Sequence, residues 1–230
     1  MKYMWSKRRI AKYLLPIILE WRKEWQRYIE PFVWWGNMIE NVSWNRIWWD
    51  INEYNILLFK WLQNWEIPQD ECLFRDYLKT KFEKKKDFRT AFIWYWCAYW
   101  GQFFWTYARW KNSKWEERNY CLESKNNIMK QKPKIEWVEF YNCSYDKLEI
   151  PNNSIIYCDP PYKNVSWYDV IKFNHNKFWK WCRDMTNEWH KVFISEYNAP
   201  YDFECIWEKE VNNPIALNSW KKAIERLYTY

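Results

Sequence analysis

The chain has 230 residues, of which 49% are hydrophobic and 28% are charged, and its mean hydropathy is −0.76. This composition excludes both a long apolar membrane-spanning run and the low hydrophobicity of a disordered chain, so it predicts one globular domain or one domain with an insertion. The 36 basic and 29 acidic residues give a net charge of +7, which favours a polyanionic partner without identifying one.

Two residue types are present in unusual numbers. The chain has 2 glycines and 23 tryptophans. Ordinary usage of about 7% glycine predicts roughly 16 glycines in a chain of this length. The imbalance needs a specific explanation.

Cysteine usage argues against disulfides and against a metal site. The seven cysteines are an odd number, form no C-x-x-C pair and are accompanied by only two histidines. The N-terminal segment is basic and then apolar, like a signal peptide, but its apolar stretch is short, is broken by Pro16 and ends at Glu20. We therefore expect an amphipathic helix in a cytoplasmic, reducing compartment, with no metal and no membrane partner.

The first part of the chain alternates helix and strand signals. Apolar spacing and turn residues predict a helix from Ile10 to Lys23, a strand over Tyr28–Phe32, a loop over Val33–Gly36, a helix near Asn37–Val42, a strand over Arg46–Asp50 and a helix over Glu53–Leu62. This β-α-β-α order predicts a parallel sheet with crossover helices.

The character of the chain changes over residues 65–136. A basic run from Lys79 to Lys86 precedes an aromatic stretch from Phe92 to Trp110. We interpret this region as an inserted, mostly helical segment. Its aromatic and basic side chains could form a surface for single-stranded nucleic acid, which would make the protein a binding module. We favour the alternative that the aromatic residues form a helix core and the lysines a solvated face.

Strand signals return in the last third of the chain. They predict strands over Val138–Tyr141, Ser154–Cys158 and Lys191–Ser195, a helix over His175–Glu188, and an antiparallel hairpin made of Glu204–Val211 and Arg226–Tyr230. We interpret His190 and Glu196, at the two ends of one strand, as structural rather than functional.

The most informative motif is Asp159-Pro160-Pro161-Tyr162, directly after the strand Ser154–Cys158. In an open α/β sheet, ligands bind outside the carboxyl ends of the strands. The two prolines stiffen the loop and lack N–H donors. A planar base with an exocyclic amine suits this set, because Asp159 and the Pro160 carbonyl can accept the amine hydrogens while Tyr162 stacks on the ring. The plainer alternative is a proline-rich turn with a capping aspartate.

This motif, the N-terminal KYMWSKRRIAKY and the late segments HKVFISEYNAP and FECIWEKEV resemble the Dam-type (class alpha) DNA N6-adenine methyltransferases of phages and bacteria. The resemblance runs over nearly the whole chain. It implies an α/β fold of the Rossmann-like S-adenosylmethionine-dependent methyltransferase type, formed by residues 1–64 and 137–230, with residues 65–136 as an inserted target-recognition segment.

The resemblance also implies the reaction and the partners. S-adenosylmethionine would be the cofactor and double-stranded DNA the partner of a monomeric, site-specific enzyme. An adenine would leave the duplex stack, and its N6 nitrogen would attack the sulfonium methyl in line while Asp159 keeps the nitrogen lone pair available. Cytosine N4 remains an alternative target.

The site residues carry over from the same resemblance. The catalytic motif would be Asp159, Pro160, Pro161 and Tyr162. The cofactor-binding residues would be Tyr3, Lys7, Glu30, Pro31, Phe32, Gly36, Asn37, Asp50 and Asp159, with Asp50 holding the cofactor's hydroxyls.

The chain departs from the family at its glycines. The family's first cofactor motif is glycine-rich because its backbone turns sharply, whereas Trp34 and Trp35 stand at two of those positions here. The same replacement is predicted at Trp5, Trp44, Trp65, Trp167, Trp189 and Trp220. We interpret the chain as a family member in which most glycines are changed to tryptophan. Because such residues would be strained and could fill the cofactor pocket, a catalytically inactive relative is the alternative to an active enzyme.

Overall fold

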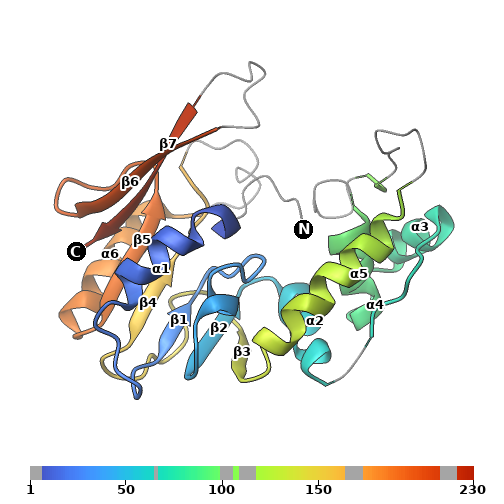
Figure 1. Cartoon of the computed structure of the whole chain (residues 1–230), viewed down its shortest axis with the longest axis horizontal. Helices are drawn as coiled ribbons and strands as arrows, with labels where there is room; N and C mark the ends of the chain where they lie inside the picture. The colour runs from blue at the N-terminus through green and yellow to red at the C-terminus, as the bar shows by residue number, and fades with distance from the viewer. Residues whose placement is uncertain (1–6, 65–66, 99–105, 109–117, 164–172, 213–221) are drawn as a thin grey trace. The chain divides into compact units, whose positions relative to one another are not determined.

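The computed structural model of the chain describes residues 7–64, 67–98, 106–108, 118–163, 173–212 and 222–230 (Figure 1). It contains two compact units. The sheet unit comprises Lys7–Ile51 and Tyr141–Tyr230, and the helical unit comprises Asn52–Phe140. Strand β3 (Val138–Asn142) spans the boundary between them.

The strands follow the order β3-β2-β1-β4-β5-β7-β6. The bounds are β1 Tyr28–Glu30, β2 Arg46–Asp50, β4 Ile155–Cys158, β5 Lys191–Glu196, β6 Glu204–Asn212 and β7 Lys222–Thr229. Strands β2, β1, β4 and β5 pair in parallel, whereas β7 is antiparallel to both β5 and β6. This mostly parallel sheet confirms the predicted α/β, Rossmann-like fold.

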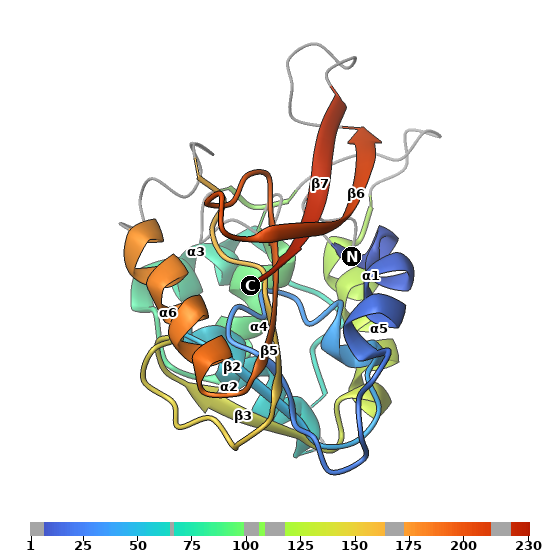
Figure 2. The same ribbon diagram turned by 90° about the vertical axis from the view of Figure 1, so that its left-hand side faces the viewer.

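Three of the parallel strands are buried along their whole length. All residues of β1, β2 and β4 are buried, as expected for parallel strands between helices. Helices α1 (Ala11–Leu19) and α6 (His175–Asn187) lie on opposite faces of β4 and β5 (Figure 2). Helix α6 buries Phe178, Trp179 and Cys182 in the core of this unit.

Three predicted elements differ from the structure near the N-terminus. Helix α1 ends at Leu19, not at Lys23, because its apolar face ends at Ile18 and the Arg22 side chain donates to the carbonyl oxygens of the loop before β2. Strand β1 ends at Glu30, since Pro31 has no N–H to donate. The helix predicted near Asn37–Val42 is only a 3-10 turn, η2 (Ile39–Asn41), because the chain is already extended at Val42.

The helical unit is built around one central helix. Helix α4 (Phe88–Cys97) contacts α2 (Glu53–Gln63), α3 (Phe74–Glu83) and α5 (Tyr120–Gln131). Ala91, Phe92, Ile93 and Trp94 are four consecutive buried residues, so this turn of α4 is apolar on all sides, as expected for a central helix.

This burial decides between the two interpretations of the aromatic stretch for the residues that the structure describes. Phe92 and Trp94 are core residues and are not available to stack on bases. Lys85 and Lys86 are exposed and pair with Glu83 and Glu53. The use of residues 65–136 for target recognition stays a prediction, and the compact unit that contains them begins earlier, at Asn52.

Three of the tryptophans predicted to replace glycine have a left-handed backbone. The φ angles are 50° at Trp34, 31° at Trp44 and 68° at Trp189. Glycine adopts such angles without cost, whereas a residue with a Cβ is strained there. Trp35 has no positive φ, and Trp5, Trp65, Trp167 and Trp220 lie outside the described residues.

Trp189 is the clearest of these positions. It directly follows Glu188, the C-cap residue of α6. Its N–H donates to the carbonyl of Thr186, and the N–H of His190 donates to the carbonyl of Met185. These two bonds define a Schellman motif, in which glycine is the usual residue at the left-handed position. The backbone therefore has a glycine conformation at a residue that is tryptophan.

We predict that Trp189→Gly stabilises the protein. Its side chain is 82% exposed, so little burial is lost, while release of the left-handed strain should raise the free energy of unfolding by about 1 kcal/mol. Trp21→Gly is the matched control, because Trp21 is also exposed in the sheet unit but has no positive φ. It should lower the free energy of unfolding by about 0.5–1 kcal/mol. Urea denaturation measures both, and equal effects would contradict the explanation.

Candidate active site

Four acidic residues meet at one edge of the sheet. Glu30, Asp50 and Glu196 end β1, β2 and β5, and Asp159 directly follows β4. These strands are parallel neighbours, so their carboxyl ends lie at the same edge. The structure thus brings together three acids that the sequence predicted for the site, Glu30, Asp50 and Asp159, and adds Glu196.

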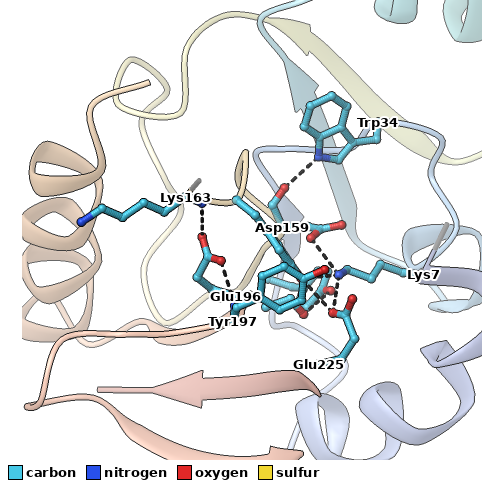
Figure 3. A network of polar contacts seen from close by, with 10 residues as sticks. Lys7, Trp34, Asp159, Lys163, Glu196, Tyr197 and Glu225 are labelled. Carbon is cyan, nitrogen blue, oxygen red and sulfur yellow. Dashed lines mark hydrogen bonds and ion pairs between the residues drawn. The ribbon is translucent and has the colours of Figure 1, made fainter. Parts of the chain in front are cut away.

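Lys7 lies buried against the Asp159 motif (Figure 3). Its Nζ is 3.3 Å from Asp159 Oδ1 and 2.9 Å from Glu225 Oε2, and it also donates to the hydroxyl of Tyr162. The Tyr162 hydroxyl in turn donates to Glu225 Oε2 over 3.0 Å. One ammonium group is therefore placed between two carboxylates and a phenol.

This arrangement sets the charges of the group. Burial lowers the pKa of Lys7, but the charges of Asp159 and Glu225 outweigh it, so the pKa is raised and the amine is charged. Burial raises the pKa of Asp159 to about 6, although Lys7 opposes the increase. Asp159 is consequently ionised at neutral pH and can accept hydrogen bonds.

Tyr162 is fixed on several sides. Its ring meets the Tyr197 ring edge-on, with 4.7 Å between the centroids and 80° between the planes. Lys7 Nζ lies 4.5 Å from the centre of the Tyr162 ring. Burial raises the pKa of the Tyr162 phenol well above its ordinary value, so the phenol stays neutral.

Glu196 holds the backbone around this tyrosine. Its Oε2 accepts the N–H of Lys163 over 3.2 Å and its Oε1 accepts the N–H of Tyr197 over 2.8 Å (Figure 3). Burial raises the pKa of Glu196 to about 7. Sequence reasoning left Glu196 out of the site, although an acid at the carboxyl end of a strand was the signal that could have found it. His190 has the structural role expected of it, because its Nδ1 accepts the N–H of Ser154.

The loop after β1 connects to this group through Trp34. The Trp34 N–H donates to Asp50 Oδ2 over 3.2 Å, and its indole Nε1 donates to the backbone carbonyl of Asp159 over 2.7 Å. Figure 3 shows the indole above Asp159. Trp34 therefore links the carboxyl ends of β2 and β4 from the loop after β1.

Gly36 needs to be glycine for two reasons. Its φ is +65°, and a Cβ built on it would lie 2.3 Å from Cη2 of the Trp48 indole. Asn37 next to it accepts a hydrogen bond from the Asn41 side chain with its backbone carbonyl. The turn of the predicted cofactor loop is thus retained at Gly36.

The remaining predicted cofactor residues have different surroundings. Glu30 is buried and accepts a hydrogen bond from the Tyr28 hydroxyl over 2.8 Å, and burial raises its pKa well above the ordinary value. Pro31 is buried, and Phe32 packs against the rings of Tyr145, Phe173 and Phe178. Tyr3 lies outside the described residues.

A family model of the D12 class N6 adenine-specific DNA methyltransferases matches residues 3–181, more than half of the chain. The chain belongs to this family. Comparison with individually curated proteins gave no match. The predicted resemblance to adenine N6 DNA methyltransferases is confirmed, and DNA is the substrate class of this methyltransferase. The family match includes Lys7 and the Asp159 motif and ends within α6, before the hairpin of β6 and β7.

Within its described residues, the methyltransferase has no group of three or more His, Cys, Asp or Glu side chains that could hold a metal ion. The helices found in the same parts of the chain are too short or too polar to cross a membrane.

We predict that Gly36→Ala destabilises this methyltransferase. The added Cβ meets the Trp48 indole at a left-handed position, which should cost about 1–3 kcal/mol of unfolding free energy. A double-mutant cycle with Trp48→Leu separates the two causes. In the Trp48→Leu background the substitution should cost only the backbone strain, about 1 kcal/mol. Strictly additive costs in urea denaturation would show that the indole is not the obstacle.

Proposed function

We propose that the chain transfers a methyl group from S-adenosylmethionine to N6 of an adenine that has left the duplex stack, within a specific DNA sequence. The observation that supports this most is the ionised Asp159, paired with Lys7 and adjacent to the Tyr162 ring at the carboxyl edge of the sheet. The family match supplies adenine N6 as the atom that is methylated.

The chemistry of an aromatic amine explains the need for these groups. The lone pair of N6 is delocalised into the purine ring, so the nitrogen is a weak nucleophile. Acceptors for its hydrogens, which would be the Asp159 carboxylate and the Pro160 carbonyl, keep the lone pair available for attack. The amine is out of reach inside the duplex, and the base therefore has to leave the stack to meet the Tyr162 ring.

Asp159 also suits the proton that the methylated nitrogen must lose. A pKa of about 6 leaves the carboxylate ionised at neutral pH and close to the range in which it can take a proton. Lys7 remains charged throughout and keeps the carboxylate in place.

The edge of the sheet fits S-adenosylmethionine in its charge and donor set. The methyl donor supplies an electrophilic methyl on a positively charged sulfonium, and the carboxylates of Asp50 and Asp159 lie at the carboxyl ends of β2 and β4, the parallel strands that flank β1 at this edge. Asp50 carries a carboxylate that suits hydroxyl donors, and Gly36 provides a turn without a Cβ. We propose that these two residues, Asn37 and Asp159 hold the cofactor.

One observation favours a second candidate function, a folded relative without transfer activity. The indole of Trp34 extends from the loop after β1 to the carbonyl of Asp159. Its backbone N–H also uses an oxygen of Asp50. A cofactor held by Asp50 and Asp159 would have to displace this side chain.

Asp159→Ala should reduce methyl transfer by at least about 100-fold, because the acceptor of the amine hydrogen is lost. The transfer of a radiolabelled methyl group from S-adenosylmethionine to DNA measures the effect. Asp202→Asn is the control, since Asp202 forms an exposed ion pair with Arg183. In the unchanged chain, the rate should fall as the pH decreases through about 6, where Asp159 becomes protonated. Unchanged transfer by Asp159→Ala would exclude this residue from the reaction.

Trp34→Gly should increase the affinity for S-adenosylmethionine by about tenfold or more, because it removes the indole that the cofactor must displace. Isothermal titration measures the dissociation constant. Trp44→Gly is the matched control. Trp44 also has a positive φ, but it precedes the amino end of β2, whereas Asp50 is at the carboxyl end of that strand. Binding of S-adenosylmethionine with the same affinity by the two variants and the unchanged chain would contradict the obstruction and favour the active enzyme.

A further inference from the structure

The hairpin of β6 and β7 contributes a residue to the site although it lies outside the family match. In the antiparallel pairing of β5 with β7, Glu196 is opposite Arg226. Glu225 is therefore placed just beyond the carboxyl end of β5, where Tyr162 lies. Its side chain is only 13% exposed and points to Lys7 (Figure 3).

We infer that Glu225 is a positioning residue of the methyl-transfer centre: its carboxylate fixes the phenol of Tyr162 and the ammonium of Lys7, and so holds Lys7 beside Asp159. The role in the reaction rests on the proposed function, whereas the contacts of Glu225 with Lys7 and Tyr162 do not depend on it.

The Lys7 ammonium uses Glu225 as one of its three hydrogen-bond acceptors. An ammonium group has three donors, and Lys7 has three acceptors, on Asp159, Glu225 and Tyr162. A buried ammonium without such partners is costly. Removing Glu225 takes away one of the two counter-charges of Lys7 and the acceptor of the Tyr162 hydroxyl together.

Two other acidic residues of the hairpin have different partners from Glu225. Glu208 pairs with Arg226 and Glu210 pairs with Lys222, and both carboxylates are more than half exposed. These pairs lie within the hairpin itself. Glu225 instead reaches across to η1 (Lys7–Arg9) and to the loop after β4.

Glu225 also affects the charge of Asp159. The titratable groups that act on Asp159 or feel its charge come from every element around it: Lys7 of η1, Glu30 of β1, Tyr157 and Cys158 of β4, Tyr162 of the same loop, Glu196 of β5 with Tyr197 directly after it, and Glu225 of β7. The negative charge of Glu225 raises the pKa of Asp159. Removing that charge while Lys7 stays in place lowers the pKa of Asp159.

The test compares Glu225→Gln and Glu225→Ala with the matched control Glu210→Gln. The first readout is the pH dependence of the chemical shift of the Asp159 carboxyl carbon, measured by NMR on the folded protein. The signal is assigned by its loss in Asp159→Asn. In Glu225→Gln, which keeps an acceptor for Lys7, Asp159 should titrate at a lower pH than in the unchanged chain, because a negative charge is removed. In Glu225→Ala, where Lys7 is no longer held, Asp159 should titrate at a higher pH than in Glu225→Gln, and Glu210→Gln should match the unchanged chain. Equal Asp159 titrations in the two Glu225 variants would contradict the positioning of Lys7.

Methyl transfer to DNA is the second readout. Glu225→Ala should lower kcat about 10- to 100-fold with little change in KM for DNA, because the site loses a charge-assisted hydrogen bond but no contact to the duplex. Glu225→Gln retains an acceptor oxygen and should restore kcat to within about threefold of the unchanged chain. If Glu225→Ala does not fold, the Asp159 titration in Glu225→Gln decides.

The outcomes separate this inference from the proposed function. Transfer by the unchanged chain, with Glu225 variants that match Glu210→Gln in both readouts, would overturn the role of Glu225 and leave the methyltransferase intact. A shifted Asp159 titration, with no transfer by any form of the chain, would support the contacts of Glu225 and overturn the proposed reaction.

Discussion

The buried ammonium of Lys7 imposes the main constraint on this site. A cation at 8% exposure needs counter-charges and acceptors, and Lys7 finds them in segments that are far apart along the chain: Asp159 and Tyr162 after β4, and Glu225 on β7. The helical turn η1, the proline-stiffened loop and the hairpin are therefore tied to one another through a single side chain. Loss of any partner leaves the others incompletely satisfied, which makes the group sensitive as a unit.

The topology of the sheet explains why these partners can meet. Parallel pairing of β2, β1, β4 and β5 brings four carboxyl ends to one edge, and the antiparallel β7 returns along β5 to place Glu225 there. Acids gathered in this way would repel one another. Lys7 places one positive charge between Asp159 and Glu225, and burial raises the pKa of Glu30 and of Glu196, which reduces the charge that they carry. Asp159, paired with Lys7, is left ionised at neutral pH.

The local part of this arrangement could be predicted from the sequence, and the long-range part could not. The motif from Asp159 to Tyr162 follows a recognisable strand, and Asp50 ends another, so strand patterns and a family resemblance were sufficient. Glu225 gave no such signal, because its contacts depend on the register of β7 against β5. The helix predicted near Asn37–Val42 was wrong for a similar reason: a run of apolar residues there is buried by the sheet unit without forming more than one turn.

The tryptophans at left-handed positions show how far the fold overrides local preference. Trp34, Trp44 and Trp189 retain backbone angles that favour glycine, at a cost of about 1–2 kcal/mol each. Trp44 and Trp189 are at least half exposed, so their strain lowers stability without altering the site. Trp34 is different, because its N–H and its indole are hydrogen-bonded to Asp50 and Asp159. A tryptophan at a left-handed position is thus only a thermodynamic burden at Trp44 and Trp189, whereas at Trp34 it competes for the groups that we propose hold the cofactor and accept the amine hydrogen.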